Sequence, residues 1–127
     1  MPYFEVDARE LQRPGWTYTI DTLATFPEAD DVVLILGADA AVGLPSWHRA
    51  DELIGSVRLA IVPRPGAAPS EVDAVLAGAD VRWLDMPEMA ISSTDLRRRA
   101  AVGMSVRFLV PHSVDEYIAQ HGLYRED

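Results

Sequence analysis

The stretch Val32-Val33-Leu34-Ile35-Leu36-Gly37 is an uninterrupted apolar run that ends in a glycine. Such a run, without alternating polar residues, is typical of a strand that is buried on both faces in a parallel sheet. The next residues, Ala38-Asp39-Ala40, place a carboxylate just beyond the end of this strand. We therefore predict a buried parallel strand here, followed by a loop that could carry function.

Strand-like and helix-like segments alternate along the rest of the chain. Further strands are expected over residues 57–62 and 81–84, with a short strand over residues 3–6. Helices are expected over residues 19–26, 47–54, 69–78, 94–102 and 114–121, with Ser46 capping the second and a Ser113/Glu116 capping box opening the last. This order predicts one α/β domain, residues 1–127, with a mostly parallel sheet flanked by helices.

Composition limits the classes of function. The 127 residues carry a net charge of −9, which argues against nucleic-acid binding because such proteins normally present a basic face. There is no cysteine, which excludes disulfides and thiolate metal sites, and all basic residues are arginine. No run approaches the roughly 18 apolar residues of a membrane span, and no signal peptide is visible at Met1. We expect a cytoplasmic protein without a membrane partner.

Ligands of open α/β sheets bind beyond the carboxyl ends of the strands. Three loops are expected there: residues 37–40, residues 63–66, and the stretch that leads into Ser92-Ser93-Thr94. In the third loop, hydroxyl side chains meet a helix start and Arg97 lies one turn further on. Unpaired backbone N–H groups, hydroxyls and a guanidinium together favour a phosphate. The alternative is an ordinary helix cap followed by solvated arginines.

Two other groups carry a functional and a structural interpretation. Gly37 permits close approach of a ligand, and Asp39 can accept ribose hydroxyls, but the same residues fit a tight turn with a capping aspartate. Trp47 can stack on a flat heterocycle, but a tryptophan of an amphipathic helix also fits the core. His48, His112 and His121 are scattered without metal-ligand spacing.

Taken together, the segments resemble the bacterial nicotinate-nucleotide adenylyltransferases over nearly the whole chain. The matching blocks, in order, are Thr17-Tyr18-Thr19-Ile20-Asp21-Thr22-Leu23; Ile35-Leu36-Gly37-Ala38-Asp39-Ala40 with Trp47; Arg64-Pro65-Gly66; Ile91 to Arg97, which fits I-S-x-T-x-[IL]-R; and Leu109-Val110-Pro111 to Tyr124. The fourth block alone occurs across related nucleotidyltransferases, whereas the ordered set is far more specific.

The resemblance implies a Rossmann-like fold and an enzyme of NAD biosynthesis. Its substrates would be ATP and nicotinate mononucleotide, with Mg²⁺ accompanying ATP. Gly37, Asp39, Ser92, Thr94 and Arg97 would bind ATP; Tyr18, Thr19, Trp47 and Arg64 would bind the mononucleotide. Catalysis would consist of positioning and neutralisation of phosphate charge, without a covalent intermediate.

One family feature is absent from these residues. The family begins with a strand leading into G-x-F-D-P-x-H-x-G-H, and no such motif occurs in the sequence. The chain is therefore expected to correspond to the C-terminal part of the enzyme, missing its first strands, and to be inactive or weakly active alone. The alternatives are a different adenylyltransferase, such as pantetheine-phosphate adenylyltransferase, and a non-catalytic nucleotide-binding fragment. A homo-oligomer, or an N-terminal fragment supplied separately, is left open as a partner.

Overall fold

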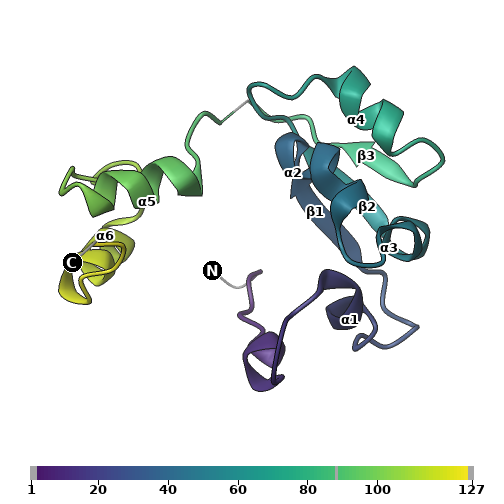
Figure 1. The fold of residues 1–127 in the computed structure, drawn as a ribbon, viewed down its shortest axis with the longest axis horizontal. Coiled ribbons are helices and arrows are strands. Elements are labelled where there is room, and N and C mark those ends of the chain that lie inside the picture. Colours follow the sequence, from purple (N-terminus) through teal and green to yellow (C-terminus); the bar gives the residue numbers. More distant parts are fainter. Residues whose placement is uncertain (1–2, 88, 126–127) are drawn as a thin grey trace. The chain divides into compact units, whose positions relative to one another are not determined.

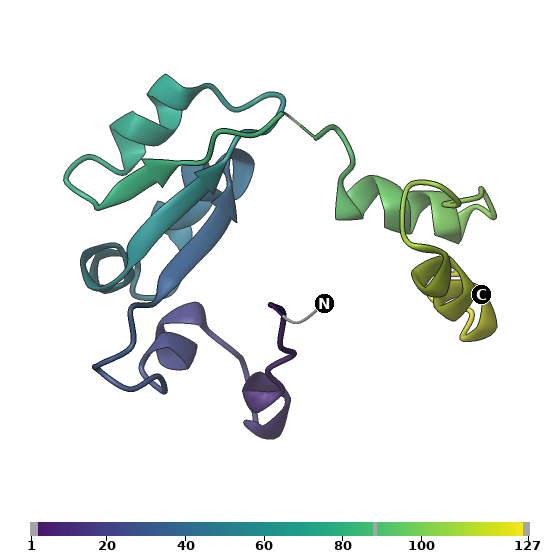
Figure 2. The same ribbon diagram turned by 180° about the vertical axis from the view of Figure 1, so that it is seen from behind.

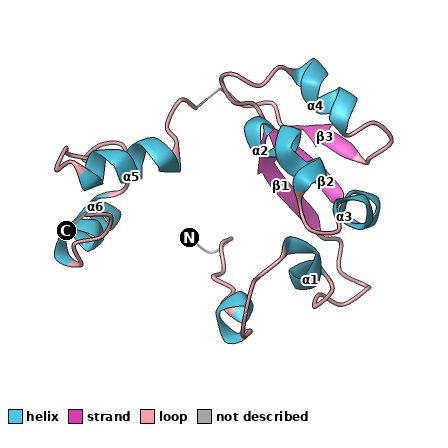
Figure 3. Ribbon diagram, viewed as in Figure 1, coloured by secondary structure: helices cyan, strands magenta, loops and turns pink. Residues whose placement is uncertain are grey.

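A computed structural model describes residues 3–87 and 89–125 (Figures 1 and 3). The chain forms two compact units, residues 1–88 and residues 89–127. The first unit contains η1 (Arg9–Gln12), α1 (Thr19–Leu23), β1 (Val33–Gly37), α2 (Ala38–Gly43), η2 (Leu44–Ser46), α3 (Ala50–Ser56), β2 (Arg58–Val62), α4 (Pro69–Val75) and β3 (Val81–Trp83). The second contains α5 (Ser93–Ala101) and α6 (His112–Gln120).

The three strands form a parallel sheet in the order β1-β2-β3. The register pairs Gly37 with Val62 and Ile61 with Trp83. All three strands therefore end at the same edge, so the loops after β1 and β2 begin side by side. The predicted α/β fold with a parallel sheet flanked by helices is confirmed.

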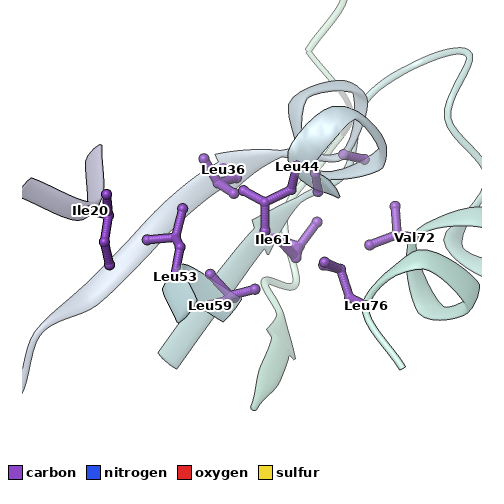
Figure 4. Packing of buried hydrophobic residues seen from close by; sticks show 10 residues of the cluster. Ile20, Leu36, Leu44, Leu53, Leu59, Ile61, Val72 and Leu76 are labelled. Atoms are coloured by element: carbon purple, nitrogen blue, oxygen red, sulfur yellow. The ribbon is translucent and has the colours of Figure 1, made fainter. Parts of the chain in front are cut away.

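The core of the first unit lies between one face of the sheet and its helices. Leu59 and Ile61 of β2 are fully buried, as are Leu44 and Leu53 from the segments that cover the sheet. Figure 4 shows these side chains in one cluster with Val72 of α4 and with Leu76, which directly follows α4, while Leu36 and Ile20 extend the cluster toward β1 and α1. Burial of these aliphatic side chains is the main stabilisation of the unit.

Among the described residues of the first unit, no helix covers the opposite face of β1. Val33 and Ile35 of β1 are 39% and 64% exposed, whereas Leu34 and Leu36, which alternate with them, pack against the core. Figures 1 and 2 show the sheet from its two sides, with α2 and α3 on only one of them. Within the first unit the helices pack against one face of the sheet only, so the prediction that this strand is buried on both faces is not met there.

Several local predictions are also wrong. Residues 3–6 form no strand, since Tyr3, Phe4 and Val6 are exposed and unpaired with the sheet. Trp47 lies outside a helix, because α3 begins only at Ala50. The first helix ends at Leu23 instead of Phe26. The last helix begins at His112 without a side-chain cap, so Ser113 and Glu116 form no capping box.

The second unit contains two short helices around a small buried centre at Val106. Helix α5 is capped by Ser92, whose Oγ accepts a hydrogen bond from the Asp95 backbone N–H at 3.1 Å. Asp95 also pairs with Arg99 at 2.8 Å and with Arg98 at 2.5 Å. These hydrogen bonds from Arg99 and Arg98 hold the pKa of Asp95 below its usual range. Gly103 ends the helix as predicted, at a φ of 73°.

No helix within residues 3–87 and 89–125 combines the length and the apolar character that a membrane crossing requires.

Two isoleucines on neighbouring strands give a matched test of the core. Because Ile61 is fully buried and Ile35 is 64% exposed, Ile61→Ala should lower the free energy of unfolding by about 2–5 kcal/mol. Ile35→Ala should cost less than about 1 kcal/mol. Urea denaturation of both variants measures the difference, and similar losses would contradict the assigned core.

Asp95 should make the second unit sensitive to acid. Its folded pKa is depressed, so its stabilisation is present above the unfolded pKa of about 4 and is lost as the pH falls through the lower folded value. At pH 6 the Asp95→Asn variant should unfold at a lower temperature than the wild type, and the two should converge once the pH falls below the folded pKa of Asp95. If the difference in melting temperature between the two proteins stays constant across this pH range, the pairs of Asp95 with Arg98 and Arg99 do not form in solution.

Candidate functional site

A small cavity lies between two segments that are distant in sequence. It has a volume of ≈ 280 Å³ and is lined by Thr17, Tyr18, Thr19, Trp47 and His48. Ligand pockets usually span about 300–1,000 Å³, so this one has room for a single ring and not for a whole nucleotide. Its walls provide aromatic faces together with hydroxyl groups.

Short helices position the two walls of this cavity. Tyr18 is the residue before α1, and its ring stacks on the imidazole of His48 with 4.0 Å between the ring centroids. Trp47 directly follows η2 and is half-buried, because part of its indole packs against the core cluster. The two interpretations of Trp47 are therefore compatible, since the side chain contacts the core and also lines the cavity.

A second group of predicted residues lies at the carboxyl ends of β1 and β2. Asp39 in the first turn of α2 and Arg64 after β2 approach to 3.8 Å, between the carboxylate Oδ1 and the guanidinium Nε. A Cβ on Gly37 would lie 2.5 Å from the Asp39 carboxylate and 3.2 Å from the Arg64 side chain. A side chain at residue 37 would therefore push the Asp39 carboxylate away from its present position beside Arg64.

The third group belongs to the second unit. Ser92 caps α5, and its hydroxyl proton stays available as a donor because the oxygen acts as acceptor in the cap. Arg97 makes a long contact of 3.5 Å with the Thr94 hydroxyl. Asp95 neutralises Arg98 and Arg99, whereas no carboxylate within the described ranges pairs with Arg97. Arg97 is therefore the arginine of this helix that is best suited to bind an anion.

The structure thus sorts the predicted residues into three groups. Tyr18, Thr19 and Trp47 share the cavity, Gly37, Asp39 and Arg64 meet at the strand ends, and Ser92, Thr94 and Arg97 lie together on α5. Sequence reasoning missed His48, which it treated as one of three scattered histidines. Its position next to Trp47 was the available signal.

A larger hollow of ≈ 710 Å³ lies at the opposite edge of the sheet, where the strands begin. Four carboxylates line it, from Glu28, Asp30, Asp31 and Asp80. Arg58 lies between two of them, at 3.2 Å from Asp80 and 3.2 Å from Asp31, and these bonds raise the pKa of its guanidinium. The excess negative charge disfavours a phosphate ligand, so volume alone does not identify the site.

In the described part of the chain, histidine, aspartate and glutamate side chains that could bind a metal ion do not gather in groups of three or more. Asp39, the carboxylate at the strand ends, pairs with Arg64. The described residues thus do not fit a Mg²⁺ site built by the protein alone.

Comparison with known proteins gives consistent results. The sequence profile of the cytidylyltransferase-like family matches residues 2–99. The probable nicotinate-nucleotide adenylyltransferase of Thermoanaerobacter sp. (strain X514) is 38% identical over 99% of this chain and 64% of its own length. That of Bordetella petrii is 42% identical over 98% and 66%, and that of Arthrobacter sp. (strain FB24) is 45% identical over 97% and 60%. The chain spans slightly less than two thirds of these relatives.

Solved structures agree in fold. The Plasmodium falciparum nicotinic acid mononucleotide adenylyltransferase complexed with NaAD superposes with a TM-score of 0.71, over 86% of this chain and 58% of that one. The same enzyme complexed with APC also gives 0.71. Identities of 19% and 20% mean that these likenesses support the fold alone. By its sequence profile, the chain belongs to the cytidylyltransferase-like family, and over nearly its whole length it is similar to proteins named as probable nicotinate-nucleotide adenylyltransferases.

Proposed function

We propose that these residues form the substrate-binding part of an enzyme that transfers an adenylyl group from ATP to nicotinate mononucleotide. In this reaction a phosphate oxygen of the mononucleotide attacks the α-phosphorus of ATP. The bond from the α-phosphorus to the bridging oxygen breaks, and pyrophosphate leaves as nicotinate adenine dinucleotide forms. The protein contributes by aligning the two phosphates and by offsetting their charge.

One observation carries the proposal. Proteins named as probable nicotinate-nucleotide adenylyltransferases align with 97–99% of this chain at 38–45% identity. The cavity between Tyr18 and Trp47 supports it independently, because its aromatic walls and its size suit a single planar ring. Thr19, on the same wall, supplies a hydroxyl and a backbone N–H that suit the carboxylate of nicotinate.

The ATP side of the proposal uses the other two groups. Arg97 supplies a guanidinium without a carboxylate partner among the described residues, and the Ser92 and Thr94 hydroxyls lie at the same helix start. These groups suit phosphate oxygens.

Asp39 is exposed and suits the ribose hydroxyls, which Gly37 allows to approach closely. Arg64, beside Asp39, suits the phosphate of the mononucleotide. Mg²⁺ enters only as the companion of ATP, and we assign it no step.

Binding of nicotinate mononucleotide by the 127-residue chain tests the proposal. Residues 1–127 should bind nicotinate mononucleotide without appreciable pyrophosphate release, because the histidine motif of the family is not among them. Trp47→Leu should weaken binding by about tenfold, since stacking on an aromatic side chain contributes roughly 1–3 kcal/mol. Trp16→Leu is the matched control, because Trp16 is 88% exposed and outside the cavity.

Isothermal titration and a coupled pyrophosphate assay check these outcomes. Substantial turnover by the isolated chain would contradict the assignment of binding alone. Pantetheine phosphate binding more tightly than the mononucleotide would favour the related adenylyltransferase. Absence of binding by both ATP and the mononucleotide would favour a non-catalytic fragment.

Two of the three consecutive arginines of α5 should differ in their effect on ATP binding. Arg97→Ala should weaken ATP binding by about tenfold, the loss expected for one charge-assisted hydrogen bond. Arg98→Ala removes the same charge from the same helix, but Arg98 is paired with Asp95, so its loss should change affinity by less than about twofold. Equal losses in the two variants would mean that only the net charge of the helix matters.

A further inference from the structure

Arg49 has an unusual backbone conformation for a residue with a side chain. It lies at φ 54° and ψ 44°, in the left-handed region, immediately before α3. L-residues other than glycine, asparagine and aspartate rarely adopt this conformation, because Cβ crowds the backbone. Its neighbours must therefore hold it there.

The Arg49 guanidinium provides these contacts with three of its nitrogens. Nε and Nη2 bind the two carboxylate oxygens of Glu52 at 2.9 Å and 2.5 Å, in a bidentate pair within the first turn of α3. Nη1 reaches the Asp21 carboxylate of α1 at 3.4 Å. The Arg49 side chain thus links the start of α3 to α1 through Asp21, which is 28 residues away in sequence.

These two helices carry the walls of the ring cavity. Asp21 follows Thr19 by two residues, and Arg49 follows Trp47 by two residues. The Asp21–Arg49 ion pair therefore ties the wall of residues 17–19 to the wall of residues 47–48. The stacked rings of Tyr18 and His48 form a second tie between the same walls.

We infer that Arg49 is a positioning residue, which holds Tyr18 and Trp47 at the separation that accepts one planar ring. The inference deepens the proposed function and rests on it for the identity of that ring. Both charges are partly exposed, with 47% and 41% of their side chains accessible, so the ion pair adds little to global stability. Because Glu52 already orders the guanidinium, the contact with Asp21 requires little further loss of side-chain entropy.

The test compares two aspartates near the same arginine. Asp21→Asn removes the contact between the walls, whereas Asp51→Asn removes an equal charge from the exposed first turn of α3. In the ligand-free protein, the ring protons of His48 report the stacked Tyr18 through its ring current. Asp21→Asn should move these proton shifts toward those of an unstacked histidine, while Asp51→Asn should leave them unchanged, at equal melting temperatures.

Titration with nicotinate mononucleotide gives the second readout. Asp21→Asn should raise the Kd about three- to fivefold, the range of an exposed ion pair, and Asp51→Asn less than about twofold. Arg49→Lys keeps the charge but loses the bidentate fork, so it should behave like Asp21→Asn. Unchanged His48 shifts and Kd in Asp21→Asn would overturn the inference. If the wild type fails to bind the mononucleotide, the proposed function fails, and the His48 shifts alone still decide the role of Arg49.

Discussion

Parallel pairing of β2 with both neighbouring strands is the constraint on which the rest of the first unit depends. Leu59 and Ile61 of this strand are fully buried and anchor the helical side of the sheet. The same pairing brings the ends of β1 and β2 together, with Gly37 opposite Val62. Asp39 and Arg64 meet for this reason, although they are far apart in sequence. The parallel pairing of β2 therefore determines both the hydrophobic core and the meeting of Asp39 with Arg64.

The exposed face of β1 is a feature that the apolar sequence pattern did not predict. An apolar run such as residues 32–36 identifies a strand, because the side chains are too hydrophobic for a surface loop. It does not show whether helices cover one face or both. Covering depends on where other segments pack, and the helices of the first unit lie on the side of Leu34 and Leu36. Val33 and Ile35 remain exposed on the other side.

Part of the candidate site could be predicted from the sequence, and the rest depends on contacts that only the folded chain makes. Topology alone places the loops after β1 and β2 together, so the proximity of Asp39 and Arg64 could be anticipated. Trp47 was a candidate for stacking from its place after the first buried strand, and the resemblance to a family added Tyr18 as a binding residue. His48 and Arg49 were missed because their roles depend on a stacking contact, a left-handed backbone and an ion pair over 28 residues. The left-handed Arg49 also explains why the helix predicted from Trp47 begins only at Ala50.

The central claim is that the cavity between Tyr18 and Trp47 binds the ring of nicotinate mononucleotide. The most direct measurement is an NMR titration of the isotope-labelled chain with this mononucleotide. We expect the indole N–H of Trp47 and the amides of residues 17–19 to shift with one common Kd. The residues around Arg58 and Asp80, at the opposite edge of the sheet, should stay unchanged. Shifts confined to that opposite edge, with the Trp47 signal unmoved, would show that the ring binds elsewhere.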